Sequence, residues 1–137
     1  MEIRKAKLND LNECQKISKT PELYLDYYGR RPDKAYLKEF LGPLFLVAIE
    51  NKKIIGYIVG EKNKAKIVSI NIIVVDKLQR GKGIGKLLLN EFILIAKKLK
   101  FKDLYLLAPK WNSKTLEFYK KAGFTEMKYY SYFTKEI

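Results

Sequence analysis

Three glycines in five positions, Gly81, Gly83 and Gly85, lie between a β-branched run and an amphipathic helix pattern. The run Ile67–Val75 is typical of a buried strand, and after it apolar residues recur with helical spacing. Glycine weakens a helix start by roughly 0.5–1 kcal/mol relative to alanine, so this order needs another reason. Strand, glycine turn and helix together present unpaired backbone N–H groups and the positive end of the helix dipole. The segment therefore predicts an anion-binding loop, with a tight turn that binds nothing as the alternative. Three cations accompany the glycines: Arg80, Lys82 and Lys86.

Two common phosphate-binding loops do not fit this spacing. A Walker A loop requires glycine at position 80 and serine or threonine at 87, where the chain has Arg80 and Leu87. A dinucleotide fingerprint requires glycine at 86, where the chain has Lys86. Both kinds of loop are excluded.

Composition limits the remaining chemistry. The 137 residues include one cysteine, Cys14, and no histidine, which excludes histidine-based triads and disfavours a zinc site. A chain of this length is expected to form one domain, residues 1–137. The longest apolar run, Leu44–Ile49, is strand-sized rather than membrane-spanning, and no signal peptide is evident. We therefore expect a cytoplasmic protein that does not enter membranes.

The net charge of +13 has two functional explanations, binding to nucleic acid or attraction of a smaller polyanion such as a nucleotide. A lysine-rich surface without a specific ligand explains it as well. Because the lysines are spread along the whole chain and no RNA-binding motif occurs, nucleic acid is the less favoured partner.

The hydrophobic pattern alternates between strand and helix periods along the chain. A hairpin is expected to turn at Asn51-Lys52, and the strands on either side of the glycine-loop helix are expected to run parallel. The expected strands are 2–6, 43–61 as a hairpin, 67–75, 103–108 and 124–136, and the expected helices are 9–19, 33–42, 84–99 and 112–124.

The glycine loop, Arg80 to Gly85, has the form R/Q-x-x-G-x-G/A and resembles the acyl-CoA pyrophosphate loop of the GNAT N-acetyltransferase superfamily. A second segment, WNSKTLEFYKKAGF, resembles the family's downstream helix. Its matching residues are Asn112, Tyr119, Gly123 and Phe124. The element order agrees over nearly the full chain, and the branch it most resembles acetylates ribosomal proteins and protein N-termini.

This resemblance implies an α/β GNAT fold, with a central mixed twisted sheet of about six to seven strands and helices on both faces. It implies acetyl-CoA as acyl donor, no metal, and a primary amine as acceptor, either a protein N-terminus or a small molecule. In the family the pantetheine arm lies beside the strand before the loop, and a backbone N–H near Val75 would hold the oxyanion. The implied cofactor-binding residues are Ile73, Val74, Val75, Arg80, Gly81, Lys82, Gly83, Ile84, Gly85, Lys86 and Asn112.

By the same resemblance, Tyr119 is the catalytic residue, a general acid that protonates the departing thiolate. A phenol keeps its proton to about pH 10, above the pKa of a thiol near 8.5, so the transfer is reasonable. The alternative is a core aromatic beside Phe118. Asn112 would bind pantetheine, cap its helix, or do both.

The sequence departs from the family at the general base, because Leu107 stands where relatives that acetylate N-termini often have an acid. Candidate replacements are Glu22 and Asp26, or a water ordered by Tyr27, Tyr28 or Tyr130. A site without a strong base favours an α-amine, since roughly a tenth of such amines are neutral at pH 7.

Two other functions remain open at the level of sequence: a CoA-binding sensor without catalysis, and a basic nucleic-acid-binding module. The aromatic final segment could pair with a second copy, so both a monomer and a homodimer are compatible with the sequence.

Overall fold

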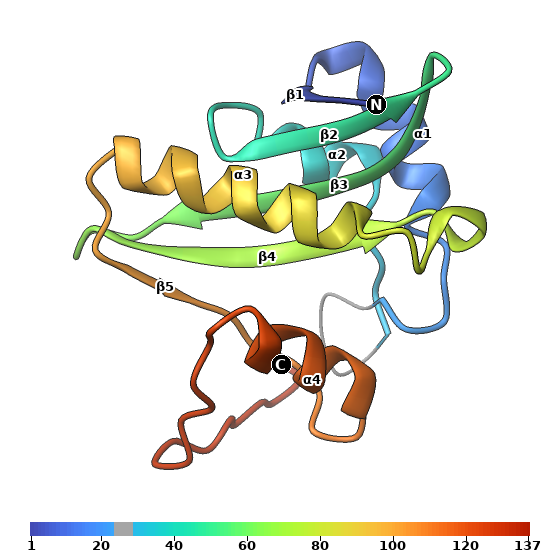
Figure 1. The fold of residues 1–137 in the computed structure, drawn as a ribbon. Helices are drawn as coiled ribbons and strands as arrows, with labels where there is room; N and C mark the ends of the chain where they lie inside the picture. The colour runs from blue at the N-terminus through green and yellow to red at the C-terminus, as the bar shows by residue number, and fades with distance from the viewer. Residues whose placement is uncertain (24–28) are drawn as a thin grey trace. The chain divides into compact units, whose positions relative to one another are not determined.

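The computed structural model describes residues 1–23 and 29–137, which divide into two compact units, Met1–Leu106 and Leu107–Ile137. The first unit contains the sheet and the glycine loop (Figure 1). The second contains one helix followed by an extended C-terminal segment. Asp26, a candidate general base, and Tyr27 and Tyr28, candidates for ordering a catalytic water, lie outside the described residues.

A five-stranded sheet in the order β1-β2-β3-β4-β5 forms the centre of the first unit. Neighbouring strands are antiparallel except β4 and β5, which run parallel and confirm the predicted crossover through the glycine-loop helix. The β2–β3 hairpin turns at Asn51 and Lys52, as predicted; both have positive φ (50° and 63°), the geometry that matches strand twist in a two-residue turn. The strands are β1 Glu2–Lys5, β2 Phe45–Glu50, β3 Lys53–Lys62, β4 Ile67–Val75 and β5 Asp103–Tyr105.

The prediction of six to seven strands is wrong, because the described residues form five. Residues 124–136, predicted as a final aromatic strand, contain no strand, and Tyr129 and Phe133 in it are 86% and 89% exposed. Aromatic residues favour a strand only when a neighbouring strand offers a hydrogen-bonding ladder and a surface to cover, and this segment has neither within its own unit. The predicted strand 103–108 is likewise shorter, ending at Tyr105.

Two of the helices, α2 and α4, begin at a side-chain cap. Asp33 accepts a hydrogen bond from the Tyr36 N–H (2.8 Å) and starts α2, as predicted from its position. The helices are η1 Leu8–Asp10, α1 Leu11–Ile17, α2 Lys34–Lys38, η2 Lys77–Gln79, α3 Ile84–Lys98 and α4 Ser113–Lys121.

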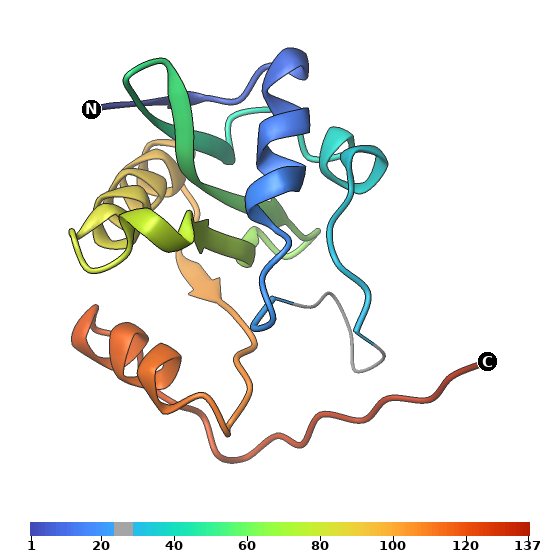
Figure 2. The same ribbon diagram turned by 90° about the vertical axis from the view of Figure 1, so that its right-hand side faces the viewer.

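Helices cover both faces of the sheet in the first unit. Figure 2 shows α3 on one side of the strands and α1 with α2 on the other. On the α1 side, Tyr57 is fully buried, and its hydroxyl lies 2.6 Å from Ser18 Oγ at the end of α1. Alternate residues of β2, β3 and β4 complete this core with residues of α1 and α2: Leu11, Cys14, Leu37, Phe45, Val47, Ile54, Val59, Ile72 and Val74.

The opposite face is shaped by two glycines of β3. A Cβ on Gly56 would lie 3.2 Å from Leu88, and one on Gly60 would lie 2.4 Å from the Phe92 ring. Without side chains at these positions, α3 approaches the strand closely, and its apolar stripe fills the groove. This packing fixes where α3 begins, and so where the glycine loop lies.

A β-bulge at Asn71 changes the face of the sheet to which the even-numbered side chains of β4 point. Val59 pairs with Ile72 and Gly60 with Ile70, so Asn71 is an extra residue on β4. Ile72 and Val74 face α1, whereas the shifted alternation places Ile70 on the face of Gly60, which α3 covers. A single strand therefore contributes to both cores.

We expect Gly60→Ala to lower the free energy of unfolding by about 3 kcal/mol, the upper part of the range for overpacking. The new methyl would lie 2.3 Å from the Ser69 carbonyl oxygen, a backbone atom that cannot rotate away. Urea unfolding followed by circular dichroism measures the change. Gly56→Ala is the matched control and should cost less, because its nearest backbone contact is 3.1 Å. Equal stability of Gly60→Ala and the parent would contradict this packing.

Candidate active site

The glycine loop turns the chain through two left-handed residues, Gly81 (φ 79°) and Gly83 (φ 82°). A Cβ at either position would meet nothing within 4 Å, so the backbone conformation, not crowding, requires glycine. The same open space leaves the loop's main chain accessible to a ligand. Ile84, 5% exposed, anchors the loop to the core immediately afterwards.

The N-terminus of α3 begins at this loop without a side-chain cap, since its N-cap is Gly83. The first intrahelical bond runs from the Leu87 N–H to the Gly83 carbonyl (3.1 Å), so the N–H groups of Ile84, Gly85 and Lys86 precede the helical ladder. With the dipole of a 15-residue helix behind them, these donors form an anion site.

Beside the loop, β4 has an open edge. Its pairing with β5 covers only Ile67 to Ser69, because β5 itself ends at Tyr105, the partner of Ser69 (Figure 1). The Asp76 N–H bonds to the Ile55 carbonyl on β3, so by the alternation of an antiparallel ladder Ile73 and Val75 direct their backbone groups away from β3. The main chain of these two residues therefore faces the open edge.

The predicted residue Val74 is oriented differently from its neighbours. It is 6% exposed, its side chain belongs to the core under α1 and α2, and its backbone faces β3. Ile73 and Val75 are partly exposed. The open edge is thus formed by the first and third of the three predicted strand residues.

The Arg80 guanidinium connects the loop to two other segments. Its Nε donates to the Val75 carbonyl (3.0 Å), Nη1 to Glu22 Oε1 (3.0 Å) and Nη2 to Thr20 Oγ1 (3.3 Å). Glu22 also accepts a hydrogen bond from the Thr20 hydroxyl. Arg80 therefore holds the end of β4 and the segment after α1 together, and a role at the cofactor stays a prediction for this side chain.

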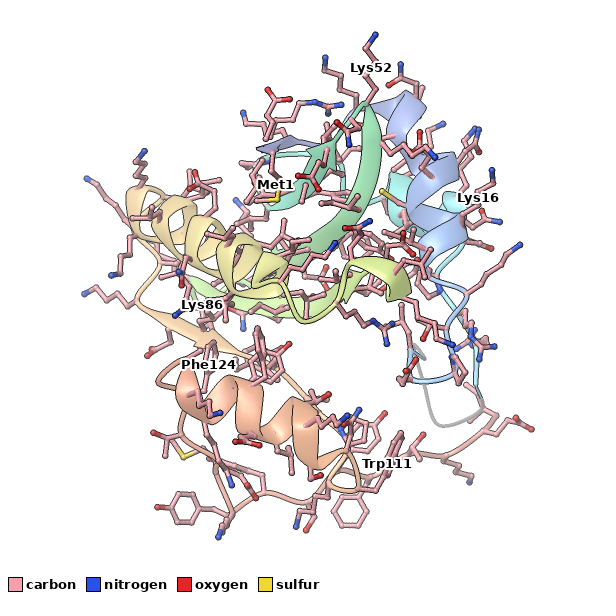
Figure 3. The ribbon with its side chains drawn as sticks, turned by 45° about the vertical axis from the view of Figure 1, so that its right-hand side comes forward. Met1, Lys16, Lys52, Lys86, Trp111 and Phe124 are labelled. Atoms are coloured by element: carbon pink, nitrogen blue, oxygen red, sulfur yellow. The ribbon has the colours of Figure 1, made fainter. Side chains whose placement is uncertain are left out.

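The two lysines of the loop lie at the surface. Lys82 Nζ donates to Gln79 Oε1 (3.0 Å), and Lys86 is exposed on the first turn of α3 (Figure 3). Both lysines lie in residues 80–86 with the N–H groups that precede the helical ladder. Their ammonium groups therefore add mobile positive charge to the anion site.

In the second unit, α4 is closed at both ends by its own sequence. Asn112 Oδ1 accepts from the Thr115 N–H (3.2 Å), which confirms its capping role. Gly123 is left-handed (φ 93°), and its N–H bonds to Lys120 O (3.1 Å) while the Phe124 N–H bonds to Tyr119 O (3.0 Å). These bonds form a Schellman motif, the physical basis of the Gly-Phe stop.

Tyr119 is buried between aromatic neighbours. Its ring makes edge contacts with Phe118 (centroids 5.1 Å apart) and Phe124 (5.4 Å). Burial raises the pKa of its phenol above the usual value of 10, because the phenolate would lose hydration. The hydroxyl therefore remains a proton donor throughout the physiological range.

Among the candidates for the general base, Glu22 forms an ion pair with Arg80. Its backbone hydrogen bond and then the Arg80 guanidinium lower its pKa, although the side chain is about half exposed. This makes Glu22 a weak base. Tyr130 is 85% exposed in the second unit.

Sequence reasoning missed the Thr20–Glu22–Arg80 connection and the bulge at Asn71. Arg80 and Glu22 are 58 residues apart, and no local pattern marks them as partners. The bulge interrupts a run that is apolar on both faces of the sheet, so periodicity gives no signal there.

Within residues 1–23 and 29–137, no helix has the length and apolar character needed to cross a membrane. The same part of the chain contains no group of three or more cysteine, aspartate or glutamate side chains that could hold a metal ion.

The first unit is thus an α/β structure with an anion-binding glycine loop at a helix N-terminus, beside the unpaired end of a strand. A sequence model described as "Acetyltransferase (GNAT) family" matches residues 8–124, and the chain belongs to this family. Its members use acetyl-CoA as acyl donor. An uncharacterized N-acetyltransferase of Methanocaldococcus jannaschii is 35% identical over 88 residues, or 60% of this chain; the match spans only 39% of that relative's length.

Solved structures share the fold. Ard1 of Thermoplasma volcanium (TM-score 0.80, 24% identity) is covered over 88% of its chain and 95% of this one. The ribosomal-protein-S18-alanine N-acetyltransferase of Escherichia coli (0.78, 18%) is covered over 78% of its chain and 92% of this one. The PaiA N-acetyltransferase of Thermoplasma acidophilum, solved with coenzyme A (0.76, 25%), is covered over 89% of its chain and 90% of this one.

We expect Gly83→Glu to weaken binding of CoA at least tenfold. A carboxylate about 5 Å from a bound phosphate costs roughly 3 kcal/mol at an effective dielectric constant of 20. Isothermal titration calorimetry with CoA and acetyl-CoA measures the loss. Gly83→Ala is the control: it introduces the same backbone strain at φ 82° and the same Cβ without charge, and should weaken binding less than Gly83→Glu. Unchanged affinity in Gly83→Glu would remove the loop from the cofactor site.

Proposed function

We propose that this protein transfers the acetyl group of acetyl-CoA to a primary amine. The observation that carries the proposal is the uncapped N-terminus of α3, with its left-handed glycine loop, beside the open edge of β4 in a chain of the GNAT family. A phosphate-bearing donor with an extended arm suits this combination. The loop suits the pyrophosphate, and the open edge suits the amide groups of the pantetheine arm.

The donor is held mainly by main-chain groups in this proposal. The N–H groups of Ile84, Gly85 and Lys86 receive the pyrophosphate, and the glycines let it approach because no Cβ intervenes. Lys82 and Lys86 neutralise its charge. The N–H and carbonyl of Ile73 bind a pantetheine amide as an added strand would, while Val75 lies beside the thioester with its carbonyl held by Arg80. Asn112 retains an NH₂ donor for the arm while its carbonyl caps α4.

The reaction is a direct attack of the neutral amine on the thioester carbonyl. The developing oxyanion is stabilised by the Val75 N–H, an effect of about 3–4 kcal/mol for a donor of this kind. Arg80 holds the Val75 carbonyl at 3.0 Å and so limits movement at the end of β4. The tetrahedral intermediate then collapses with cleavage of the C–S bond, and Tyr119 gives its proton to the departing thiolate of CoA. The proton lost by the amine nitrogen passes to solvent, and solvent returns a proton to Tyr119.

An α-amino group is the acceptor we propose. Glu22 is a weakened base within an ion pair, and an α-amine near pKa 8 needs little help to lose its proton. One of the similar folds carries a name that fits this acceptor class, the ribosomal-protein-S18-alanine N-acetyltransferase. The proposed localisation is cytoplasmic, and the chain is proposed to act as one domain.

Tyr119→Phe should lower kcat by about 100-fold, the lower end for loss of a general acid, and leave the KM for acetyl-CoA nearly unchanged. Steady-state kinetics with detection of the free thiol measures both constants. Tyr36→Phe is the matched control, since it removes a half-buried hydroxyl from α2. A wild-type kcat in Tyr119→Phe would assign that tyrosine to packing. A sensor would bind acetyl-CoA without any turnover.

At pH 7 we expect peptides with a free N-terminus to be acetylated at least tenfold faster than N-acetylated peptides containing lysine. The neutral fraction differs by about 250-fold between amines with pKa values of 8 and 10.4, which sets the upper limit of the preference. Mass spectrometry of peptide pairs with one sequence measures the ratio. Preferential acetylation of lysine would overturn the acceptor assignment and leave the acetyl transfer itself intact.

A further inference from the structure

The lysines that look scattered in the sequence gather at one end of the first unit. The register Ile67↔Asp103 places the β3–β4 turn next to the connection between α3 and β5, so Lys66 and Lys102 directly precede paired residues. Neither segment, 62–66 or 97–102, contains an acidic residue, although Glu61 and Asp103 flank them. All of the lysines there are exposed. This lysine end comprises Lys62, Lys64, Lys66, Lys97, Lys98, Lys100 and Lys102.

The lysine end is separate from the proposed donor site. The glycine loop precedes α3, and the lysines follow it, so the 15 residues of α3 separate the two sites by about 22 Å. Seven like charges at one end repel one another, and a polyanion there would offset this repulsion. The donor is bound elsewhere, so the proposed reaction does not explain the cluster.

Two of these lysines occupy backbone positions that favour glycine. Lys66 is the last residue of the β3–β4 turn and is itself left-handed (φ 59°), a conformation common at this position of a hairpin loop. Lys100 (φ 66°) ends α3 in a Schellman motif, with bonds from Lys100 N to Lys97 O (2.9 Å) and from Phe101 N to Ala96 O (3.0 Å). The same position after α4 is Gly123. At the lysine end, a charged side chain stands where glycine would fit with less strain.

We propose that the lysine end is a docking surface for the phosphate backbone of double-stranded RNA. Ammonium groups on flexible stems contact phosphates without reading sequence, and neither segment contains an arginine. Phe101, the aromatic residue of these segments, is partly buried and provides no stacking platform for single-stranded bases. The choice of RNA rests on the proposed function: new protein N-termini arise at the ribosome, whose surface is largely folded RNA.

The test uses a labelled 20-base-pair RNA hairpin of arbitrary sequence, without acetyl-CoA, followed by fluorescence anisotropy across salt concentrations. Contacts with about five phosphates predict a slope near −4 in the plot of log affinity against log salt. The variant Lys66→Gly/Lys100→Gly should bind at least fivefold more weakly and reduce the slope by about 2. Its melting temperature should not fall, because glycine accepts the left-handed conformation of both positions. A normal affinity for CoA would show that the donor site is intact.

Lys16→Gln/Lys52→Gly is the matched control. It also removes two exposed charges and one left-handed lysine (φ 63°), from α1 and from the tip of the β2–β3 hairpin (Figure 3). The hairpin tip is separated from the β3–β4 turn by the ten residues of β3, about 30 Å. The control should bind RNA within twofold of the parent.

Equal weakening in both double variants would overturn the proposal, because net charge alone would then explain binding. Tighter binding to a DNA duplex of the same length, or to phosphatidylserine-containing vesicles at matched charge, would also overturn it. Failure of the acetyltransferase proposal would appear in calorimetry and peptide assays, and leaves RNA affinity unaffected. The two proposals therefore fail separately.

Discussion

The separation of β4 from β5 after Ser69 is the constraint on which the candidate site depends. A strand inside a sheet normally satisfies its backbone groups on both sides, and β4 does so only over its first three residues. Beyond that point the main chain of Ile73 and the N–H of Val75 are left for another partner, while the Val75 carbonyl is held by Arg80. The crossover through α3 makes the first three residues pair in parallel, and the glycine loop places the N-terminus of that helix at the opened end.

Around this opening, main-chain groups are available to a ligand, whereas the Arg80 side chain holds segments of the protein together. The main-chain groups available to an anion are N–H donors whose geometry depends on Gly81 and Gly83, and the guanidinium of the nearby Arg80 already makes contacts within the protein. Through the Val75 carbonyl, Glu22 and Thr20, Arg80 connects the end of β4 to the segment after α1. A fixed backbone suits an anion site, because its donors are already oriented before the ligand arrives.

The sequence predicted the local features of this protein well, since each has a local physical cause. The loop required glycine for its left-handed turns, Asp33 and Asn112 capped their helices, and the Gly123-Phe124 pair ended α4. Features that depend on distant segments were not predictable. The final strand was expected from aromatic residues alone, and the Arg80–Glu22 contact joins segments that no periodicity relates. The gathering of lysines likewise follows from the pairing of β4 with β5, which the sequence order conceals.

The extra residue at Asn71 reverses which residues of β4 face each side of the sheet. Before the bulge, even-numbered residues face α3, and after it even-numbered residues face α1 and α2. Substitution at any one position changes one contact. Deletion of Asn71 itself would keep both facings, because Ile70 and Ile72 would then alternate as Gly60 and Val59 do, whereas deletion at another position of β4 would turn every side chain on one side of the change to the opposite core. Relatives of this protein can therefore vary the residues of β4 more freely than its length, and natural insertions and deletions should be confined to the bulge and to the turns on either side.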